Sequence, residues 1–333
     1  MMETQEIGSF RKPHYLAAHF KSLNESEFLK TAERATIETI DLFENAGLEN
    51  IGVGGEMFRW EMYEHPISRI GGITIYGPVR SFDNRYYNKG SVVNELSRLR
   101  PFHVEEVKLL KKIGKKNVKV PITGPYTLMD WSFNDYYNSR EELALAFSKI
   151  LNEEIRELKA LWGEDVLQIQ IDEPAATTHP SEMDLVLESV NEAVKGVNGI
   201  ETHIHVCYSS DYGLLFKLIP DLNVSVFNLE FANRDTISLS GERVGYADVK
   251  RFSEAAASSS RKIILGVGVT DVHINMVEQP DLIESRIKFA LKHIDPDRIR
   301  LNPDCGLRTR SREIGFQKLK NMVVAREHVV KEL

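Results

Sequence analysis

Short apolar runs rich in β-branched residues alternate with longer segments of helical periodicity along the sequence, and this alternation restricts the fold more than any other feature. Strand-type runs that alternate with helical segments are typical of βα units, which build a parallel sheet. Eight such runs indicate a closed (β/α)₈ TIM barrel rather than an open doubly wound sheet. The predicted strands are Glu6–Phe10, Asn50–Gly55, Asn117–Gly124, Val166–Asp172, Glu201–Tyr208, Asn223–Phe231, Lys262–Val269 and Arg298–Pro303.

Helical spacing fills most of the segments between these runs. We expect residues 1–333 to form one catalytic domain, because no low-complexity linker or internal repeat divides them. The spacing is irregular across residues 57–92, where a small hairpin at Gly71–Val79 and many aromatic residues predict an insertion over the barrel mouth. The predicted helices include Glu25–Asn45, Val93–Ile113, Glu141–Trp162, Glu182–Val197, Asp281–His293 and Ser311–Val330.

Composition and charge exclude several classes of protein. A net charge of −7 argues against a nucleic-acid surface, which needs a basic face. No apolar run reaches the roughly 18 residues of a membrane span, and the first residues do not resemble a signal peptide, so we expect a cytoplasmic protein. The only cysteines are Cys207 and Cys305, and in such a protein a single pair suggests metal binding or catalysis before a disulfide.

Polar or reactive residues stand at the ends of nearly all the predicted strands. The carboxyl ends of all strands in a parallel barrel share one face, and active sites are built there. The sequence therefore predicts a functional site at that face. The residues in question are Ser9, Glu56, Asp172, Glu173, His205, Cys207, Glu230, Asp271, His273, Asp304 and Cys305.

Four of these residues have the chemistry of a zinc site. His205 and Cys207 are two apart on a strand, so their side chains point to the same face. Glu230 and Cys305 follow two other strands, and one nitrogen, two thiolates and a carboxylate form a tetrahedral set suited to Zn²⁺. The alternatives are that both cysteines are small buried packing residues and that Glu230 is an ion-pair partner at the barrel mouth. His203 lies one pleat deeper, as a core histidine or a supporting partner of the site.

Eight motifs distributed over the chain resemble those of the cobalamin-independent methionine synthases, in particular their C-terminal catalytic half and the short archaeal relatives that consist of that half alone. NPDCGLRTR and the combination of HVCY with IDEPA are the most specific. The motifs are IGSF at Ile7–Phe10, GGE at Gly54–Glu56, TGPYTLMDWSF at Thr123–Phe133, IDEPA at Ile171–Ala175, HVCY at His205–Tyr208, NLE at Asn228–Glu230, DVH at Asp271–His273 and NPDCGLRTR at Asn302–Arg310.

The resemblance implies a barrel of the uroporphyrinogen decarboxylase and methionine synthase type, and methyl transfer to L-homocysteine to give L-methionine. It implies zinc ligation by the four residues named above and a proton-donor role for His273. Trp131 is expected to form an aromatic wall for a flat methyl donor or to pack in the core. The residues that the resemblance places against homocysteine are Ile7, Gly8, Ser9, Glu56 and Asp172.

This chemistry suits those residue types. The thiolate is the nucleophilic form of a thiol, and zinc deprotonates a thiol that coordinates it. Asp172 and Glu56 can accept the ammonium group of homocysteine, although both could instead form ion pairs at the barrel rim. Asp271 or a backbone carbonyl is expected to orient the ring of His273.

Two departures from the family bear on the methyl donor. The two-domain members carry an Arg-Cys pair at the folate, where this chain reads Tyr76-Gly-Pro-Val-Arg80, and a folate-contacting glutamate is replaced by Thr178. We therefore expect methylcobalamin or a corrinoid protein as donor rather than methyltetrahydrofolate. Folate-dependent activity with a separate N-terminal partner is the alternative.

Three other functions compete with this one. The chain could methylate another thiol, such as coenzyme M, but a sulfonate would require basic residues in place of Glu56 and Asp172. It could decarboxylate a porphyrinogen, although that reaction needs neither zinc nor a cysteine pair. It could also be an idle zinc-binding subunit that senses homocysteine.

Overall fold

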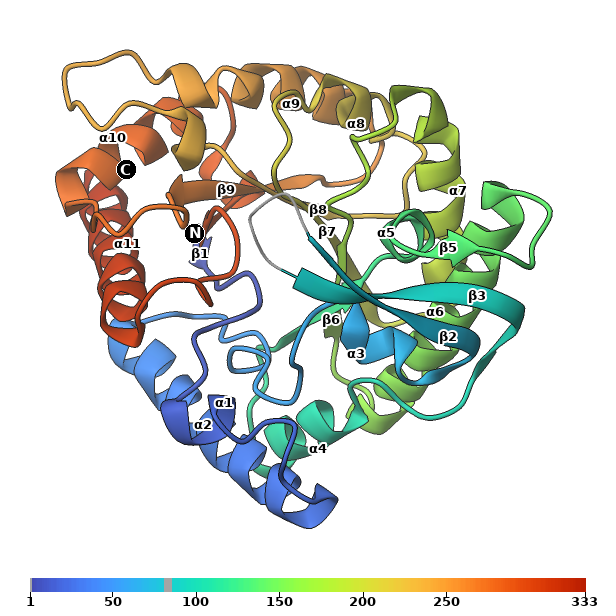
Figure 1. Ribbon diagram of the computed structural model, residues 1–333. Coiled ribbons are helices and arrows are strands. Elements are labelled where there is room, and N and C mark those ends of the chain that lie inside the picture. The colour runs from blue at the N-terminus through green and yellow to red at the C-terminus, as the bar shows by residue number, and fades with distance from the viewer. Residues whose placement is uncertain (1, 81–85) are drawn as a thin grey trace.

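Seven parallel strands curve around a central axis and are enclosed by helices in the computed structural model, which describes residues 2–80 and 86–333 (Figure 1). The strand order is β1-β10-β9-β8-β7-β6-β4, and all neighbouring pairs are parallel. This architecture confirms the predicted α/β barrel. The strands are β1 Glu3–Thr4, β4 Lys119–Thr123, β6 Leu167–Asp172, β7 Ile200–Val206, β8 Val226–Leu229, β9 Ile264–Thr270 and β10 Ile299–Pro303.

Residues 50–55 follow β1 and α2 in the chain, where a regular barrel would place its second strand. We expected a strand here, but a single parallel bridge between Gln5 and Asn50 is all that forms. Positive φ angles of 54°, 74° and 82° at Gly52, Gly54 and Gly55 turn the backbone out of the extended conformation. The Asn50 side chain supplies a further connection by donating a hydrogen bond to Gln168 Oε1 on β6 at 2.8 Å.

The long helices agree with the predicted ones to within a few residues, with one exception. Val93–Ile113 was wrong as a single helix, because its first residues belong to a strand that ends at Arg98 and its helix begins only at Val104. No helix among the described residues has the length and apolarity to cross a membrane. The helices are α1 His14–Ala17, α2 Glu25–Ala46, α3 Glu64–Ile67, α4 Val104–Lys112, α5 Pro125–Asp130, α6 Arg140–Trp162, α7 Met183–Val194, α8 Gly213–Lys217, α9 Asp248–Ala257, α10 Pro280–Leu291 and α11 Arg312–Glu332, with short 3₁₀ turns η1 Pro180–Glu182, η2 Ala232–Arg234, η3 Val244–Tyr246 and η4 Pro296–Arg298.

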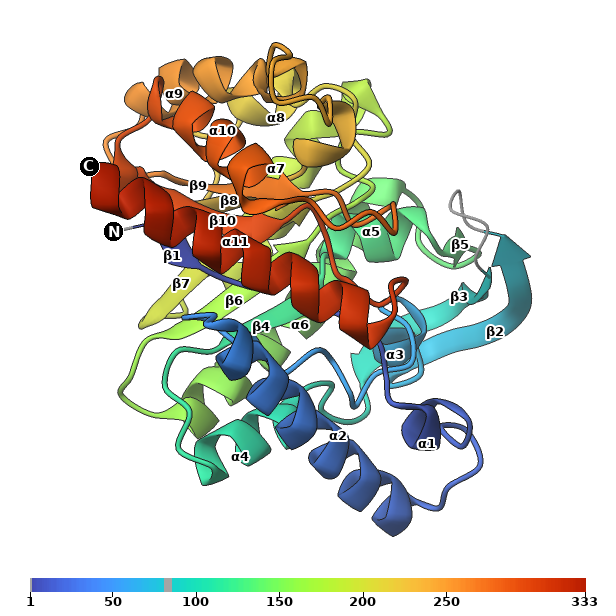
Figure 2. The same cartoon turned by 90° about the vertical axis from the view of Figure 1, so that its left-hand side faces the viewer.

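A second, three-stranded sheet lies at the mouth of the barrel, where the sequence predicted an insertion. It consists of β2 Ile70–Arg80, β3 Tyr86–Arg98 and β5 Phe133–Asn134. β2 and β3 form an antiparallel hairpin that projects from the barrel (Figure 2). The hairpin is larger than predicted, since Gly71–Val79 lies wholly within β2. Residues 81–85 of the predicted insertion lie outside the described residues.

The barrel interior below the site is polar, which the apolar strand pattern did not predict. Gln5 Nε2 donates to Asn228 Oδ1 at 2.8 Å and to Asn302 Oδ1 at 3.2 Å. The fully buried Lys119 donates to Gln5 Oε1 at 3.1 Å and to the carbonyl of Glu6 at 2.5 Å. Burial is tolerated because these groups satisfy one another's hydrogen bonds.

Candidate metal centre and reaction cavity

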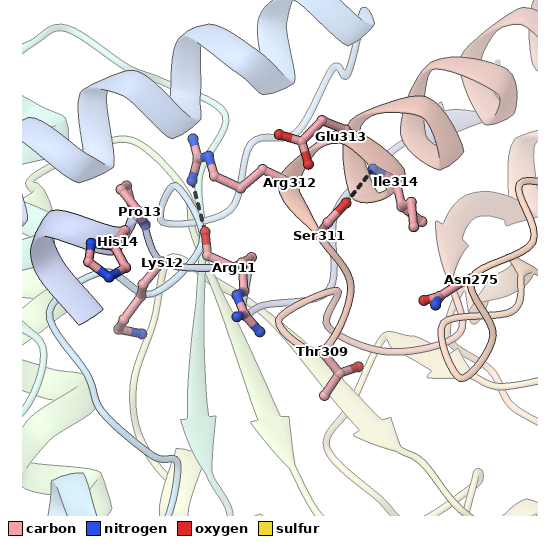
Figure 3. Close-up of a pocket in the computed structure, with 10 residues that line it drawn as sticks. All are labelled: Arg11, Lys12, Pro13, His14, Asn275, Thr309, Ser311, Arg312, Glu313 and Ile314. Carbon is pink, nitrogen blue, oxygen red and sulfur yellow. Dashed lines mark hydrogen bonds between the residues drawn. The ribbon is translucent and has the colours of Figure 1, made fainter. Parts of the chain in front are cut away.

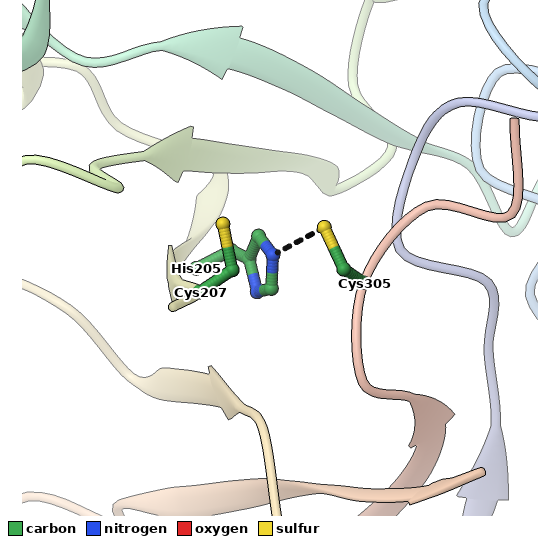
Figure 4. A group of neighbouring side chains, drawn as sticks. All are labelled: His205, Cys207 and Cys305. Carbon is green, nitrogen blue, oxygen red and sulfur yellow. Dashed lines mark hydrogen bonds between the residues drawn. The ribbon is translucent and has the colours of Figure 1, made fainter. Parts of the chain in front are cut away.

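His205, Cys207 and Cys305 come together at the carboxyl ends of β7 and β10. Their ligand atoms all lie within 4.8 Å of one another, and His205 Nε2 is 3.4 Å from Cys305 Sγ (Figure 4). Among the described residues this is the group of histidine, cysteine and acidic side chains close enough to hold one metal ion. One imidazole nitrogen and two sulfurs suit Zn²⁺.

The imidazole of His205 is oriented by the backbone. Its Nδ1 donates a hydrogen bond to the carbonyl oxygen of Asn228 at 2.9 Å, because a carbonyl can only accept. Nε2 is therefore the nitrogen that faces the sulfur atoms. A metal-binding histidine usually donates a hydrogen bond of this kind from the ring nitrogen that does not face the metal.

The two cysteines differ in their affinity for a proton. A hydrogen bond from Cys207 and the positive charge of His205 hold the pKa of the Cys305 thiol well below its ordinary value. The same sulfur–sulfur hydrogen bond, together with burial, raises the pKa of Cys207. Burial alone would lower the pKa of His205, but the charges of Cys305 and Asp172 outweigh it and raise that pKa to about 9. Of the two cysteines, Cys305 is thus the one whose thiolate form the surroundings favour.

Glu230 directly follows β8 and lies outside this three-residue group. Its Oε2 accepts hydrogen bonds from Tyr208 N at 2.7 Å and Asn233 Nδ2 at 3.1 Å. Its Oε1 accepts one from His273 Nε2 at 3.3 Å. The carboxylate is fully buried, and its ligation of zinc remains a proposal.

A cavity of about 330 Å³ opens above the metal centre. Its lining includes every residue that was predicted as a metal ligand, as a substrate contact or as the proton donor, apart from Glu230. Among the described residues, the predicted site thus forms one enclosure at the carboxyl ends of the strands. The predicted residues that line it are Ile7, Gly8, Ser9, Glu56, Trp131, Asp172, His205, Cys207, His273 and Cys305.

The GGE motif places Glu56 against the IGS segment. Glu56 has a φ of 60°, a left-handed conformation that non-glycine residues adopt only when their surroundings enforce it. A β-carbon on Gly8 would lie 2.6 Å from Glu56 Oε1, so a larger residue at position 8 would displace this carboxylate from its present position. Strained backbone of this kind is typical of sites where a side chain must point at a ligand.

Asp172 and Glu173 are adjacent acids that point in opposite directions. Asp172 lines the cavity, and burial together with the charge of Glu56 raises its pKa to about 7 against the opposing effect of His205. Glu173 instead caps α5 by accepting hydrogen bonds from Tyr126 N at 2.9 Å and Thr127 N at 2.7 Å. Glu173, one of the polar strand ends in the sequence, is therefore structural.

His273 follows β9 and reaches the rim of the cavity. Asp271 was expected to orient its ring, but Asp271 Oδ1 accepts from the backbone N–H of His273 at 2.8 Å. Glu230 contacts the ring, and their hydrogen bond raises the pKa of His273. His203 lies below the site, where it is bonded to Glu201 Oε1 at 2.8 Å and belongs to the polar interior.

Aromatic side chains form one wall of the cavity, as the position of Trp131 suggested. Trp131 stacks on Tyr87 of the hairpin, with ring centroids 5.4 Å apart. Trp131 also packs against the core, and its contact with a flat methyl donor stays a prediction. Sequence reasoning missed three further lining residues: Trp60 in the segment before α3, Tyr87 on the hairpin and Arg308 in the loop after Cys305.

Comparison with known proteins agrees with this geometry. The family described as "Cobalamin-independent synthase, Catalytic domain" matches residues 2–328. A methionine synthase of Thermoplasma acidophilum is 59% identical over 99% of this chain and 98% of its own length. One from Thermococcus kodakarensis is 39% identical over 100% and 95%. A solved B12-independent methionine synthase from Shewanella sp. W3-18-1, in complex with selenomethionine, has a TM-score of 0.83 at 25% identity and covers 100% of this chain and 98% of its own.

Proposed function

Because the chain belongs to the cobalamin-independent methionine synthase family, we propose that it is a methionine synthase, which transfers a methyl group to the thiol of L-homocysteine. The observation that carries the proposal is the position of His205, Cys207 and Cys305 in a cavity that also contains Glu56 and Asp172. That arrangement offers a thiol-binding centre and two acceptors for an ammonium group within one small enclosure.

The three residues fit a zinc ion, because the donor set is soft and His205 already presents Nε2 to the sulfurs. Glu230 is the proposed fourth ligand. Bound zinc would lower the pKa of the substrate thiol and keep its sulfur nucleophilic at neutral pH.

The residues of the chain then hold the amino-acid end of the substrate. Glu56 and Asp172 accept hydrogen bonds from its ammonium, while Ile7, Gly8 and Ser9 line the same side of the cavity. Trp131 and Tyr87 exclude water from the face that the methyl donor approaches. Fixed positions of this kind lower the entropy cost of bringing sulfur and methyl group into line.

We propose a methylated corrinoid as donor. Thr178 is exposed and donates its hydroxyl to the carbonyl of Ala175 at 2.7 Å, so it does not replace the glutamate that contacts folate in the two-domain relatives. Tyr76 lies on the hairpin with 71% of its surface exposed. Methyltetrahydrofolate remains the competing donor, since the family is named for its independence of cobalamin.

The test is methionine formation by the zinc-loaded protein, measured by mass spectrometry. Homocysteine and 2-mercaptoethanesulfonate serve as acceptors, and methylcobalamin and methyltetrahydrofolate as donors. We expect methionine from homocysteine, with methylcobalamin the better donor and little methylation of the sulfonate thiol. Preferential methylation of the sulfonate would reject the acceptor, and faster turnover with methyltetrahydrofolate would reject the donor.

A further inference from the structure

Arg308 is a cation without a partner in the wall of the reaction cavity. It is part-buried and lies three residues after Cys305. No residue in 2–80 or 86–333 forms a hydrogen bond or an ion pair with its guanidinium. A guanidinium that lines a cavity without a protein partner matches the two oxygens of a carboxylate or phosphate.

A second cavity, of about 430 Å³, adjoins the first at Thr309, which lines both. Its wall carries Arg11, Lys12 and Arg312 (Figure 3). Arg312 is already bonded to the carbonyl of Arg11 at 2.8 Å, and Lys12 to the carbonyl of Glu56 at 3.0 Å. The guanidinium of Arg11 has no hydrogen bond or ion pair among the described residues.

Lys12 and Arg308 lie close enough for their charges to repel each other. Burial and then the charge of Arg308 lower the pKa of Lys12 to about 7. Glu313 is the acidic residue that lines the second cavity in the described part of the chain. An anion bound at Arg308 would relieve this repulsion, because opposite charges favour each other's ionised forms.

We propose that Arg308, assisted by Arg11, binds an anionic group of the methyl donor and thereby positions the donor over the metal centre. The inference rests on the proposed function and adds the recognition of the second substrate. Two donors supply the same chemistry: the glutamate carboxylates of a folate and the phosphodiester of a cobalamin.

The electrostatic surroundings favour the donor over homocysteine as the ligand of Arg308. The charges that act most strongly on Asp172 are those of His205, Glu56 and Cys305. Arg308 acts instead on Lys12 and Glu61. Lys12 lines the second cavity, whereas His205 and Cys305 belong to the metal centre.

The experiment compares donors that differ in the number of anionic groups. Methylcobalamin is paired with methylcobinamide, which lacks the phosphodiester together with its ribose and benzimidazole base, and monoglutamyl methyltetrahydrofolate is paired with its triglutamate. In Arg308→Gln we expect the KM of the anionic donor that the enzyme uses to rise at least about tenfold, the loss typical of a charged hydrogen bond. The KM of homocysteine should change less than about twofold, as should turnover with methylcobinamide.

Two further variants sharpen the comparison. Arg308→Lys keeps the charge without the two-pronged geometry and should recover part of the affinity. Arg100→Gln removes an exposed arginine that lines neither cavity and should resemble the wild type. Arg11→Gln should weaken the anionic donor less than Arg308→Gln.

Binding is also measured by calorimetry with methylcobalamin and the triglutamyl folate, alongside zinc content and melting temperature. A rise in homocysteine KM alone would make Arg308 a homocysteine ligand. Equal losses with methylcobalamin and methylcobinamide would show that no anion is bound. Either result overturns the proposal.

If the wild type forms no methionine, the proposed function fails. The calorimetry then tests Arg308 by itself, and equal affinities in wild type and Arg308→Gln would reject it.

Discussion

His205 Nε2 lies 3.4 Å from Cys305 Sγ, although the two residues are 100 positions apart in the chain. β7 contains His205, Cys305 lies two residues after the end of β10, and the strands β8 and β9 separate β7 from β10 in the sheet. The curvature of the sheet brings both side chains over the barrel axis. The metal centre is therefore a product of that curvature.

Replacing Cys305 with serine should abolish tight zinc binding. A hydroxyl lacks the charge and softness of the thiolate that the structure stabilises at this position. We expect the zinc affinity to fall by more than the roughly 10–100-fold that supporting residues contribute. Mass spectrometry of the metal and the sulfur-to-metal absorption of the cobalt-substituted protein measure the loss. Normal zinc occupancy in Cys305→Ser would reject the ligand assignment.

Glu230→Gln should retain zinc but alter the response to homocysteine. The carboxylate lies outside the group of three ligands, and the substrate thiolate needs a coordination position. We expect zinc affinity within about tenfold of the wild type and a changed homocysteine KM. Glu61→Gln, another carboxylate of the cavity, is the matched control. Complete loss of zinc in Glu230→Gln alone would make Glu230 an essential ligand.

His273→Ala should affect the two donors differently. A folate leaves as an amine that must be protonated, and a general acid contributes about 10²–10⁴ in rate, whereas a corrinoid leaves as cobalt(I) without a proton. We expect methylcobalamin-dependent kcat to fall less than about tenfold and any folate-dependent kcat to fall by the larger factor. His179→Ala, at an exposed histidine, is the control. Equal large losses with both donors would show that His273 serves homocysteine or the metal.

Substitution of Asp172 should impair homocysteine binding, whereas substitution of the adjacent Glu173 should impair stability. Asp172→Asn removes a cavity carboxylate and should raise the homocysteine KM at least about tenfold. Glu173→Gln disturbs the cap of α5 and should leave that KM within about twofold while lowering the free energy of unfolding by about 1–3 kcal/mol. Steady-state kinetics and urea unfolding of both variants decide this. A raised homocysteine KM in Glu173→Gln with a loss of stability in Asp172→Asn would contradict this assignment.

Lys119 should make stability depend on pH in the alkaline range. Burial lowers its pKa from the ordinary 10.5 to about 8. Between these values the unfolded chain binds more protons than the folded one, so the free energy of unfolding rises with pH. Relative to Lys119→Met, the wild type should gain about 1–3 kcal/mol between pH 8 and 10.5, measured by urea unfolding at each pH. The exposed Lys116→Met should run parallel to the wild type, and a flat difference for Lys119→Met would refute the prediction.

Local patterns were sufficient for much of the fold. The periodicity of Glu25–Asn45 and Glu141–Trp162 located α2 and α6 to within a residue at each end. Such helices bury one face whose spacing is visible in a single segment. Residues 93–98 resemble a helix locally, yet they pair with β2, because a strand partner more than ten residues away is invisible to local periodicity.

The sequence by itself determined which residue types stand at the ends of the strands, and it thereby predicted a functional site there. The tertiary structure alone decided their directions: Asp172 into the cavity, Glu173 into the cap of α5, and Glu230 toward His273. It also decided that Arg308 has no partner among the described residues. The reason is that neighbouring strand residues point to opposite faces, and which face meets a cavity depends on elements far away in the chain.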